Sequence, residues 1–388
     1  MPTPVAERTW LFTCRHTFET TLADELVVLG IHARHLHILG PGLVRAELRA
    51  APPATLADLR HWDPTYALQV LPDAVRVEAV SVKLLADAVL AVALPVLQAA
   101  APSVPAVDPF LAPNPPLPLT NFAWDVHAIV PGQLKGNPNP PLQRRAALVA
   151  DGFVAGVQAR ARRLAKARVP GGRKLDVLVQ ILLDSPGLAW LSASPVRPLP
   201  GLGSWPSTLP AGLAEVPDDP LAPASSFRKL VEAFACMDVW PQPGDLVVDL
   251  GASPGGWTRV VRALGVHVTA VDRAELAPHL MADPGVTFVK GDAFAWTPER
   301  TVDWLVSDVV AFPERMVEFI DTWCRLRLAR RMVVQMKFKR GPDRVAMAAA
   351  QAAAERHGYS ARARHFFNDK NEVTWMVSAG VETGSAGP

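Results

Sequence analysis

Cysteine is scarce in this sequence of 388 residues. Its three cysteines, Cys14, Cys236 and Cys324, are an odd number spread along the chain, which excludes a scaffold held together by disulfides. Cysteine and histidine also do not gather at the spacing of metal ligands, so we expect no metal site. The sequence therefore predicts a protein of a reducing compartment, and we expect a cytoplasmic location.

Long apolar runs are also missing. The first ten residues contain no basic stretch followed by an apolar one, so the sequence predicts no secretory signal. The most lipid-like segment, 89–97, contains Pro95 and is shorter than the roughly 20 residues that span a bilayer. We expect a buried core helix there and no association with a membrane.

Charge of one sign is not in large excess, because the formal net charge is only +2. A hydrophobic fraction of 49% with 20% charged residues is typical of a folded chain and excludes disorder throughout. The length exceeds what one core usually organises, so two or three domains are expected. A strongly basic or acidic protein is excluded, and the distribution of charge becomes more informative than its sum.

Proline, in contrast, is abundant, with 38 residues against an average usage of about 5%. Eleven prolines fall within 102–141 and eight within 195–223, so both stretches are predicted to be loops or linkers. Before the first stretch, alternation at 10–14 and 35–48 predicts strands, and apolar spacing at 18–29 predicts a helix. This pattern indicates a small α+β domain.

A basic segment follows the first proline-rich stretch. Residues 144–166 are predicted to be mostly helical, between strands at 122–130 and within 175–191. Nine basic residues stand against Asp151 alone: Arg144, Arg145, Arg160, Arg162, Arg163, Lys166, Arg168, Arg173 and Lys174. One basic face results, which is either a solvated surface or the electrostatic footprint of a nucleic-acid binder.

After residue 223 short apolar strands alternate with helical patterns. The strands are predicted at 246–250, 267–272, 286–290, 302–308 and 332–337, with a final antiparallel hairpin at 362–367 and 372–378. Such alternation predicts a parallel sheet with helices on both faces, an α/β domain of the Rossmann-like type. Its ligand site is expected at the carboxyl ends of the strands.

A glycine-rich turn follows the first of these strands and allows three interpretations. Gly251, Gly255 and Gly256 let the backbone turn sharply and approach a ligand. A dinucleotide site would place Asp272 on a ribose, but Ser253 stands where the phosphate fingerprint requires glycine. This substitution weakens the dinucleotide interpretation.

The second interpretation is a hydrolase. Residues 251–255 match the nucleophile-elbow motif with Ser253 as the nucleophile, and Asp308 and His365 follow in the order of a catalytic triad. The residue after the serine must donate its backbone N–H to the oxyanion hole, and here it is Pro254, which has none. The hydrolase interpretation is therefore disfavoured.

The third interpretation is a site for S-adenosyl-L-methionine. This cofactor has ribose hydroxyls, an amine and an adenine but no phosphate, so it requires backbone at a glycine turn and carboxylates at successive strand ends. Asp249, Asp272, Asp292 and Asp308 all stand at predicted strand ends. Their joint placement favours this interpretation.

The same segment resembles a known family. From residue 225 onward the chain is similar to the FtsJ/RrmJ-type ribose 2′-O-methyltransferases, on the sequences Asp-Leu-Gly-Ala-Ser-Pro-Gly-Gly-Trp-Thr, Val-Asp-Trp-Leu-Val-Ser-Asp, the strand ending in Lys337 and Asn-Glu-Val-Thr. Nearly the whole chain resembles the RlmM family, which methylates a cytidine of bacterial 23S rRNA. The resemblance implies that cofactor contacts come from Ser225, Gly251, Pro254, Gly255, Gly256, Trp257, Asp272, Asp292 and Asp308.

The resemblance also implies a catalytic set of Lys229, Asp308, Lys337 and Glu372, with Lys337 as the general base. Independently of the family, a ribose hydroxyl needs a base to remove its proton, and lysine can act only when its pKa is lowered. A second lysine and burial are the two means available. Lys339 follows closely and leaves the choice of base open.

RNA is the expected partner. A second basic cluster surrounds the predicted strand 332–337, and its members are Arg325, Arg327, Arg330, Arg331, Lys337, Lys339, Arg340 and Arg344. We expect RNA contacts from Arg160, Arg163, Lys166, Lys339 and Arg340. The target is expected to be an unpaired nucleotide, since its 2′-hydroxyl is more reachable in a loop.

The resemblance completes the domain assignment. It implies a ferredoxin-like domain at 1–80, a THUMP-like RNA-binding domain at 81–200, a proline-rich linker at 201–224 and a Rossmann-like methyltransferase domain at 225–388. We expect a monomer. The alternatives are a methyltransferase acting on tRNA and a catalytically silent RNA-binding protein that keeps the cofactor fold.

Overall fold

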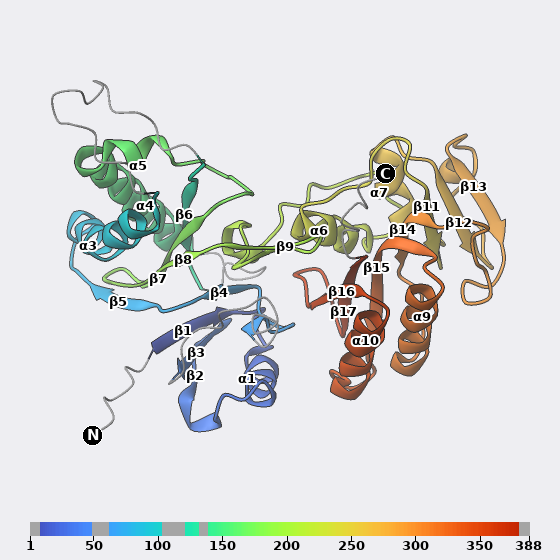
Figure 1. Ribbon diagram of the computed structural model, residues 1–388, viewed down its shortest axis with the longest axis horizontal. Helices are drawn as coiled ribbons and strands as arrows, with labels where there is room; N and C mark the ends of the chain where they lie inside the picture. The colour runs from blue at the N-terminus through green and yellow to red at the C-terminus, as the bar shows by residue number, and fades with distance from the viewer. Residues whose placement is uncertain (1–7, 49–61, 103–120, 132–138, 380–388) are drawn as a thin grey trace, which may run out of the picture. The chain divides into compact units, whose positions relative to one another are not determined.

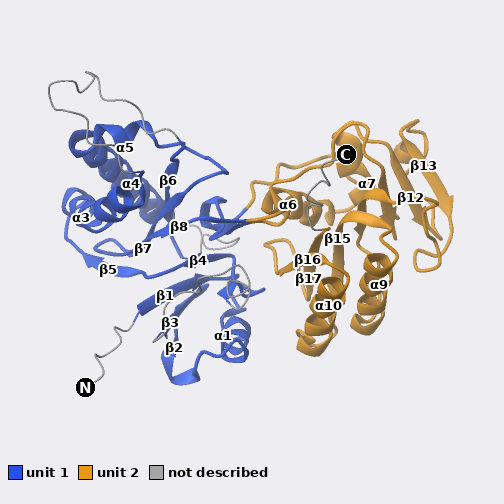
Figure 2. Cartoon of the chain, in the orientation of Figure 1, with its two compact units in different colours: residues 1–198, 204–213 blue, residues 199–203, 214–388 orange. Residues whose placement is uncertain are grey.

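The chain forms two compact units in the computed structural model, which describes residues 8–48, 62–102, 121–131 and 139–379. Unit 1 comprises Met1–Pro198 and Ser204–Leu213, and unit 2 comprises Leu199–Gly203 and Ala214–Pro388 (Figure 2). The chain therefore passes between the units three times within the second proline-rich stretch. Most of the first proline-rich stretch lies outside the described residues.

Unit 1 begins with a four-stranded antiparallel sheet in the order β2-β3-β1-β4 (Figure 1). Its elements are β1 (Arg8–Thr13), α1 (Glu19–Val28), the 3-10 turn η1 (Ala33–His35), β2 (Leu36–Gly40), β3 (Leu43–Leu48) and β4 (Gln69–Leu71). The alternation at 35–48 is thus a hairpin rather than one strand. Burial alternates along the end of β3, where Val44, Ala46 and Leu48 are buried, whereas Trp10, Leu11 and Phe12 of β1 are all buried.

A second four-stranded sheet of unit 1 has the order β5-β8-β7-β6. It contains β5 (Val75–Glu78), β6 (Trp124–Ile129), β7 (Val177–Ser185) and β8 (Leu188–Pro195), with helices α3 (Val82–Ala100), α4 (Pro140–Arg160) and α5 (Arg162–Lys166). Strand β6 runs parallel to β7, whereas the other pairs are antiparallel. The predicted strands at 122–130 and within 175–191 and the predicted helix at 144–166 are confirmed.

Helix α3 is the predicted core helix. Leu85, Val89 and Leu97 are fully buried in one core with Phe153 of α4 and Trp124 of β6. By length and composition alone, α3 is also the one helix among the described residues that could cross a membrane. Pro95 lies inside the helix and does not end it.

Two short strands, β9 (Arg197–Leu199) and β10 (Gly203–Trp205), form a two-stranded ribbon, and the 3-10 turn η3 (Pro210–Gly212) follows them. The peptide bond between Trp205 and Pro206 is cis. The stretch predicted to be a linker at 201–224 therefore contains some regular structure.

Unit 2 is built on a seven-stranded sheet in the order β13-β12-β11-β14-β15-β17-β16. Its strands are β11 (Val247–Leu250), β12 (Val268–Asp272), β13 (Val286–Lys290), β14 (Val302–Ser307), β15 (Ala329–Lys337), β16 (Tyr359–Arg364) and β17 (Glu372–Ala379). Its helices are α6 (Phe227–Met237), α7 (Gly256–Ala263), α8 (Pro278–Met281), α9 (Pro313–Arg325) and α10 (Arg344–Arg356). The first five strands are parallel, and the final hairpin pairs antiparallel with them. The predicted Rossmann-like sheet is confirmed.

Helices cover both faces of this sheet, as the sequence predicts. Alternate residues of a strand point to opposite faces. Val333 of β15 packs in one core with Phe234 of α6 and Val261 of α7, so the buried Met332 and Val334 face the other side. Helices α9 and α10 pack against each other and against β15 and β16 (Figure 1).

Candidate active site

The carboxyl ends of the five parallel strands lie along one edge of the sheet, and a glycine turn follows the central strand, β11. Gly251 has φ +76°, and a Cβ atom there would lie 2.9 Å from the Cβ atom of Val309. Gly255 has φ +111°, and its Cβ atom would lie 2.3 Å from Leu280. Only glycine combines these backbone angles with such close packing, so both residues shape the turn.

A pocket of about 190 Å³ opens beside this turn. It is lined by Gly251, Asp272, Arg273, Gly291, Asp292, Ala293, Phe294, Val309, Val310 and Arg315. The carboxyl ends of β11, β12, β13 and β14 all contribute, which is where the sequence predicts a ligand site. Gly251, Asp272 and Asp292 are thus brought together as expected.

Asp272, the last residue of β12, fastens the glycine turn. Its Oδ2 accepts a hydrogen bond from the backbone N–H of Ser253 at 2.9 Å, and its Oδ1 accepts one from the N–H of Ala274 at 2.9 Å. A carboxylate has about four lone-pair directions, so each oxygen can still accept from a ligand. Asp272 therefore stabilises the turn through these two hydrogen bonds and can also accept hydrogen bonds from a ligand in the pocket.

Asp292 lies across the pocket, after β13. Its Oδ1 accepts from the backbone N–H of Phe294 at 2.9 Å, and its Oδ2 pairs with Arg273. The N–H of Phe294 and the Arg273 guanidinium hold the pKa of Asp292 below its usual range. The guanidinium of Arg315 stacks 3.8 Å from the centroid of the Phe294 ring. Nothing in the sequence pattern predicts this stacked pair.

Asp249 is the buried carboxyl group beneath the turn. Its Oδ2 accepts from the hydroxyl of Thr258 at 2.6 Å, whereas its Oδ1 is buried with no hydrogen-bond partner among the described residues. Burial raises its pKa to about 7, although the Thr258 hydrogen bond opposes this rise. A buried polar atom without a partner is expected to be satisfied by a ligand or water.

The four predicted catalytic residues come together from four elements of unit 2. Lys337 ends β15 and is paired in register with Glu372, the first residue of β17. Lys337 Nζ lies 2.8 Å from Asp308 Oδ1 and donates a hydrogen bond to the Asp308 carbonyl oxygen at 2.7 Å. Lys229 Nζ of α6 lies 2.5 Å from Glu372 Oε1 and 3.8 Å from Asp308 Oδ1. The four side chains form a continuous chain of alternating charge.

The two lysines have different environments. The side chain of Lys229 is 10% exposed, and that of Lys337 is 24% exposed. Burial alone lowers the pKa of Lys229, but the carboxylates of Asp308 and Glu372 outweigh it and raise this pKa above its ordinary value. Lys229 is therefore held as an ammonium, which is the opposite of what a lysine base requires.

Two further acids of unit 2, Asp369 and Glu232, are buried. Asp369 accepts from the backbone N–H of Phe366 at 2.8 Å and from the hydroxyl of Thr374, and burial raises its pKa well above its usual range. Glu232 accepts from the backbone N–H of Asn368 at 3.1 Å. The sequence pattern indicates only a polar turn at 368–371, so the burial of Asp369 is not predictable from it.

The hydrolase triad is not assembled. The Ser253 hydroxyl donates to the Glu275 carbonyl oxygen at 2.9 Å, and His365 Nε2 lies 3.0 Å from the Lys370 carbonyl oxygen. Asp308 is occupied by Lys337. Ser253, Asp308 and His365 thus have separate partners.

Not every residue expected to contact the cofactor lines the pocket. Trp257 is 2% exposed within the core, and its ring N–H donates to the Ser226 carbonyl oxygen at 2.9 Å. Ser226, rather than the exposed Ser225, places its hydroxyl next to the turn, because a Cβ atom on Gly256 would lie 3.1 Å from it. The Pro254 carbonyl oxygen accepts from the Ala277 N–H at 2.9 Å.

The structure separates the predicted basic clusters into residues that pair within the fold and residues that are exposed. In unit 1, Arg145 donates to the Pro186 carbonyl oxygen at 2.5 Å, and Arg168 pairs with Asp125 at 2.9 Å, so both serve the fold. Arg160 lies 3.8 Å from Asp87, and Lys166 is exposed. The basic segment is thus not one uninterrupted face.

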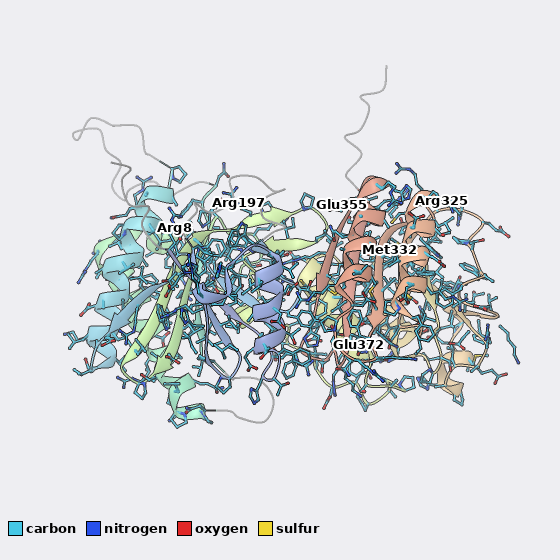
Figure 3. All side chains as sticks on the ribbon, turned by 90° about the horizontal axis from the view of Figure 1, so that it is seen from below. Arg8, Arg197, Arg325, Met332, Glu355 and Glu372 are labelled. Atoms are coloured by element: carbon cyan, nitrogen blue, oxygen red, sulfur yellow. The ribbon has the colours of Figure 1, made fainter. Side chains whose placement is uncertain are left out.

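In unit 2, the basic residues around β15 lie at two opposite ends. Nine residues of a strand span about 30 Å, so the basic residues before and within the start of β15 are far from Lys337. Figure 3 shows Arg325 and Glu372 at opposite ends of the unit. Only Lys337, Lys339, Arg340 and Arg344 remain at the catalytic edge. The single cluster expected from the sequence is therefore corrected to two.

No group of His, Cys, Asp and Glu that could hold a metal ion occurs among the described residues.

Comparison with known proteins finds that most of unit 2 is similar to a known family. Residues 224–373 match the family described as FtsJ-like methyltransferase, so the resemblance stated from the motifs is confirmed over this part of the chain. The "Ribosomal RNA large subunit methyltransferase M" of Halorhodospira halophila is 38% identical over 173 residues, which cover 44% of this chain and 50% of that protein. The protein of the same name from Thauera aminoaromatica is 33% identical over 212 residues, 52% of this chain and 56% of that protein. The chain spans about half the length of the curated relatives that it matches.

Proposed function

We propose that this protein is an S-adenosylmethionine-dependent RNA ribose 2′-O-methyltransferase that acts on a cytidine of bacterial 23S rRNA. The observation that carries the proposal is the chain of alternating charge formed by Glu372, Lys229, Asp308 and Lys337, in that order, beside a pocket lined by strand-end carboxylates. The match of residues 224–373 to FtsJ-like methyltransferases supports the reaction type. The names of the relatives support rRNA as the substrate.

The residues around the pocket fit the cofactor. The backbone at Gly251, which lines the pocket, would lie against it, and Asp272 and Asp292 would accept from its ribose hydroxyls and adenine amine. The partnerless Oδ1 of Asp249 supplies a buried acceptor near the turn. When bound, S-adenosylmethionine supplies an electrophilic methyl group.

Lys337 is the proposed general base. Two contacts to Asp308, at 2.7 and 2.8 Å, fix the position of its amine, and Asp308 thereby orients the base. Lys229 is held as an ammonium by Glu372 and Asp308, so it supplies fixed positive charge rather than accepting a proton. In its neutral form, the Lys337 amine would accept the proton of the ribose 2′-hydroxyl.

Unit 1 is proposed to bind RNA at a distance from the target nucleotide. The order β2-β3-β1-β4 with one helix after β1 supports a ferredoxin-like domain, predicted at 1–80, and the second sheet with α3 and α4 is the proposed THUMP-like domain, predicted at 81–200. Strand β5 (Val75–Glu78) pairs with β8 of the second sheet, so the boundary between the two domains lies before residue 75 rather than at residue 80. The methyltransferase domain would then cover 225–388, after a linker at 201–224. Arg160, Arg163 and Lys166 are proposed phosphate contacts, in a cytoplasmic monomer.

The proposal is tested with the purified full chain, radiolabelled S-adenosylmethionine and separate 23S rRNA and tRNA transcripts. We expect ribose methylation of one nucleotide in 23S rRNA, mapped by mass spectrometry of nuclease fragments. Lys337→Ala is expected to lower the rate by a factor of about 10² to 10⁴, the usual contribution of a general base, while cofactor affinity stays near the wild-type value. If only tRNA is methylated, the substrate is tRNA and not 23S rRNA. If the Lys337→Ala enzyme is active, Lys337 is not the general base.

A further inference from the structure

The segment that joins β14 to α9 exposes apolar side chains next to the catalytic residues. Phe312 is 58% exposed and Val310 is 80% exposed, although Asp308 at the start of the same segment belongs to the catalytic cluster. Two other aromatic rings near this edge are used internally, since Phe294 stacks on Arg315 and Phe338 is 8% exposed. Phe312 therefore contributes little to the core of unit 2.

A cation lies on the exposed ring. Lys339 Nζ is 4.5 Å from the centroid of the Phe312 ring, within the range of a cation–π contact. Phe312 follows Asp308 by four residues and Lys339 follows Lys337 by two, and these two catalytic residues are themselves paired at 2.8 Å. The Phe312 ring is therefore close in sequence to Asp308, and the Lys339 ammonium is close in sequence to Lys337. Lys339 and Arg340 are both exposed.

We propose that Phe312 and Lys339 form a stacking site for an unpaired RNA base adjacent to the methylated nucleotide. An exposed aromatic ring flanked by cations is the combination with which proteins bind single-stranded nucleic acid, the ring stacking on a base and the cations contacting phosphates. The exposed charges of Lys339 and Arg340 complement RNA and disfavour a basic or purely apolar partner. The proposal rests on the proposed function and assigns a substrate subsite to it.

The experiment separates binding from methyl transfer. A single-stranded RNA of about ten nucleotides, with 2-aminopurine beside the central cytidine, is titrated with the full chain, and fluorescence reports both affinity and stacking. The variants are Phe312→Ala, Phe312→Leu, Phe312→Trp and Lys339→Gln. Leu326→Ala is the matched control, because Leu326 is 49% exposed and lies before β15, at the opposite end from Lys337.

We expect Phe312→Ala to weaken binding roughly 5- to 150-fold, the range found when a stacking side chain is removed, and to lose the quenching. Phe312→Leu keeps an apolar side chain and should lose nearly as much, whereas Phe312→Trp should bind like the wild type. Lys339→Gln should reduce the slope of log affinity against log salt by about one. Leu326→Ala should match the wild type throughout.

Unchanged binding and quenching in Phe312→Ala would overturn the proposal, as would equal affinities for Phe312→Leu and the wild type. Methylation assays on the same variants distinguish a failure of the stacking site from a failure of the proposed function. If the wild type methylates rRNA and Phe312→Ala has the same kcat/KM, the stacking site is wrong and the proposed function stands. If the wild type methylates no RNA, the proposed function fails and the titration still decides whether Phe312 stacks on a base.

Discussion

Asp308 is the residue on which the catalytic cluster depends, because it contacts both lysines. Its carbonyl oxygen and one carboxylate oxygen fix Lys337, and the same carboxylate helps to keep Lys229 charged. The sequence shows two lysines and two acids with no order among them. The structure gives each lysine a preferred acid, Glu372 for Lys229 and Asp308 for Lys337, and so a different role for each amine.

The carboxylates of the pocket give a prediction about cofactor affinity. Asp272→Ala and Asp292→Ala should each weaken the binding of S-adenosylmethionine about ten- to over a hundred-fold, because each removes a charged acceptor of a hydrogen bond from the cofactor. Titration calorimetry measures the effect. Asp272→Ala should also lower the melting temperature slightly, since Asp272 fastens Ser253, whereas Asp292→Ala is the more local change. Wild-type affinity in both folded variants would exclude these residues from the cofactor site.

Asp249 gives a prediction about pH. Its pKa is raised from 3.8 to about 7 in the folded protein, so the folded state holds one more proton than the unfolded state between these values. The contribution of this group to stability is full below pH 3.8 and is lost as the pH rises towards 7. Asp249→Asn removes the titration, so the free energy of unfolding of the variant relative to wild type should rise between pH 5 and pH 8, by up to about 3 kcal/mol. Denaturant titrations at both pH values measure this difference, and a difference independent of pH would contradict the assignment.

At the scale of elements, most strands of unit 2 could be predicted because burial on both faces produces short apolar runs between glycines and prolines. The strand ends at Asp272 and Lys337 and the place of Asp308 directly after β14 follow from those runs, and with them most of the candidate site. The start of β15 could not be placed, because Ala329 to Arg331 belongs to the strand despite two arginines. Pairing between elements, such as Lys229 of α6 with Glu372 of β17, depends on distant contacts that no local pattern encodes. The burial of Asp369 is unpredictable for the same reason.

The ribbon strand β10 gives a prediction about an element boundary. Gly203 has φ +85°, and a Cβ atom there would lie 1.9 Å from the Cys236 carbonyl oxygen. Gly203→Ala should therefore destabilise the protein by more than the roughly 1–2 kcal/mol that a left-handed backbone costs other residues. Gly358→Ala is the matched control, with φ +81° and no atom within 4 Å of its Cβ position. Thermal unfolding measures both variants, and equal melting temperatures would show that the Cys236 contact relaxes freely.

At the scale of the whole molecule, the two basic regions are expected to divide the work of binding RNA. Reversing Arg160, Arg163 and Lys166 to glutamate should raise the KM for RNA and flatten its salt dependence while leaving cofactor affinity unchanged. Phosphate contacts position RNA without reading its bases, so the methylated nucleotide should stay the same. Filter binding across a salt series, together with site mapping, tests this. A triple variant with normal binding and methylation would leave RNA capture to the residues beside Lys337.

The path of the chain between the units has a consequence for how such a protein can evolve. Leu199–Gly203 belongs to unit 2, where Leu202 is buried and its carbonyl oxygen accepts from Arg362 at 2.8 Å, and the next ten residues return to unit 1. A break after residue 198 deprives unit 1 of Ser204–Leu213, and a break after residue 203 or 213 deprives unit 2 of Leu199–Gly203. Recombination at one point of the gene therefore cannot leave both units intact. Unit 1 and unit 2 are therefore expected to be inherited together and to coevolve.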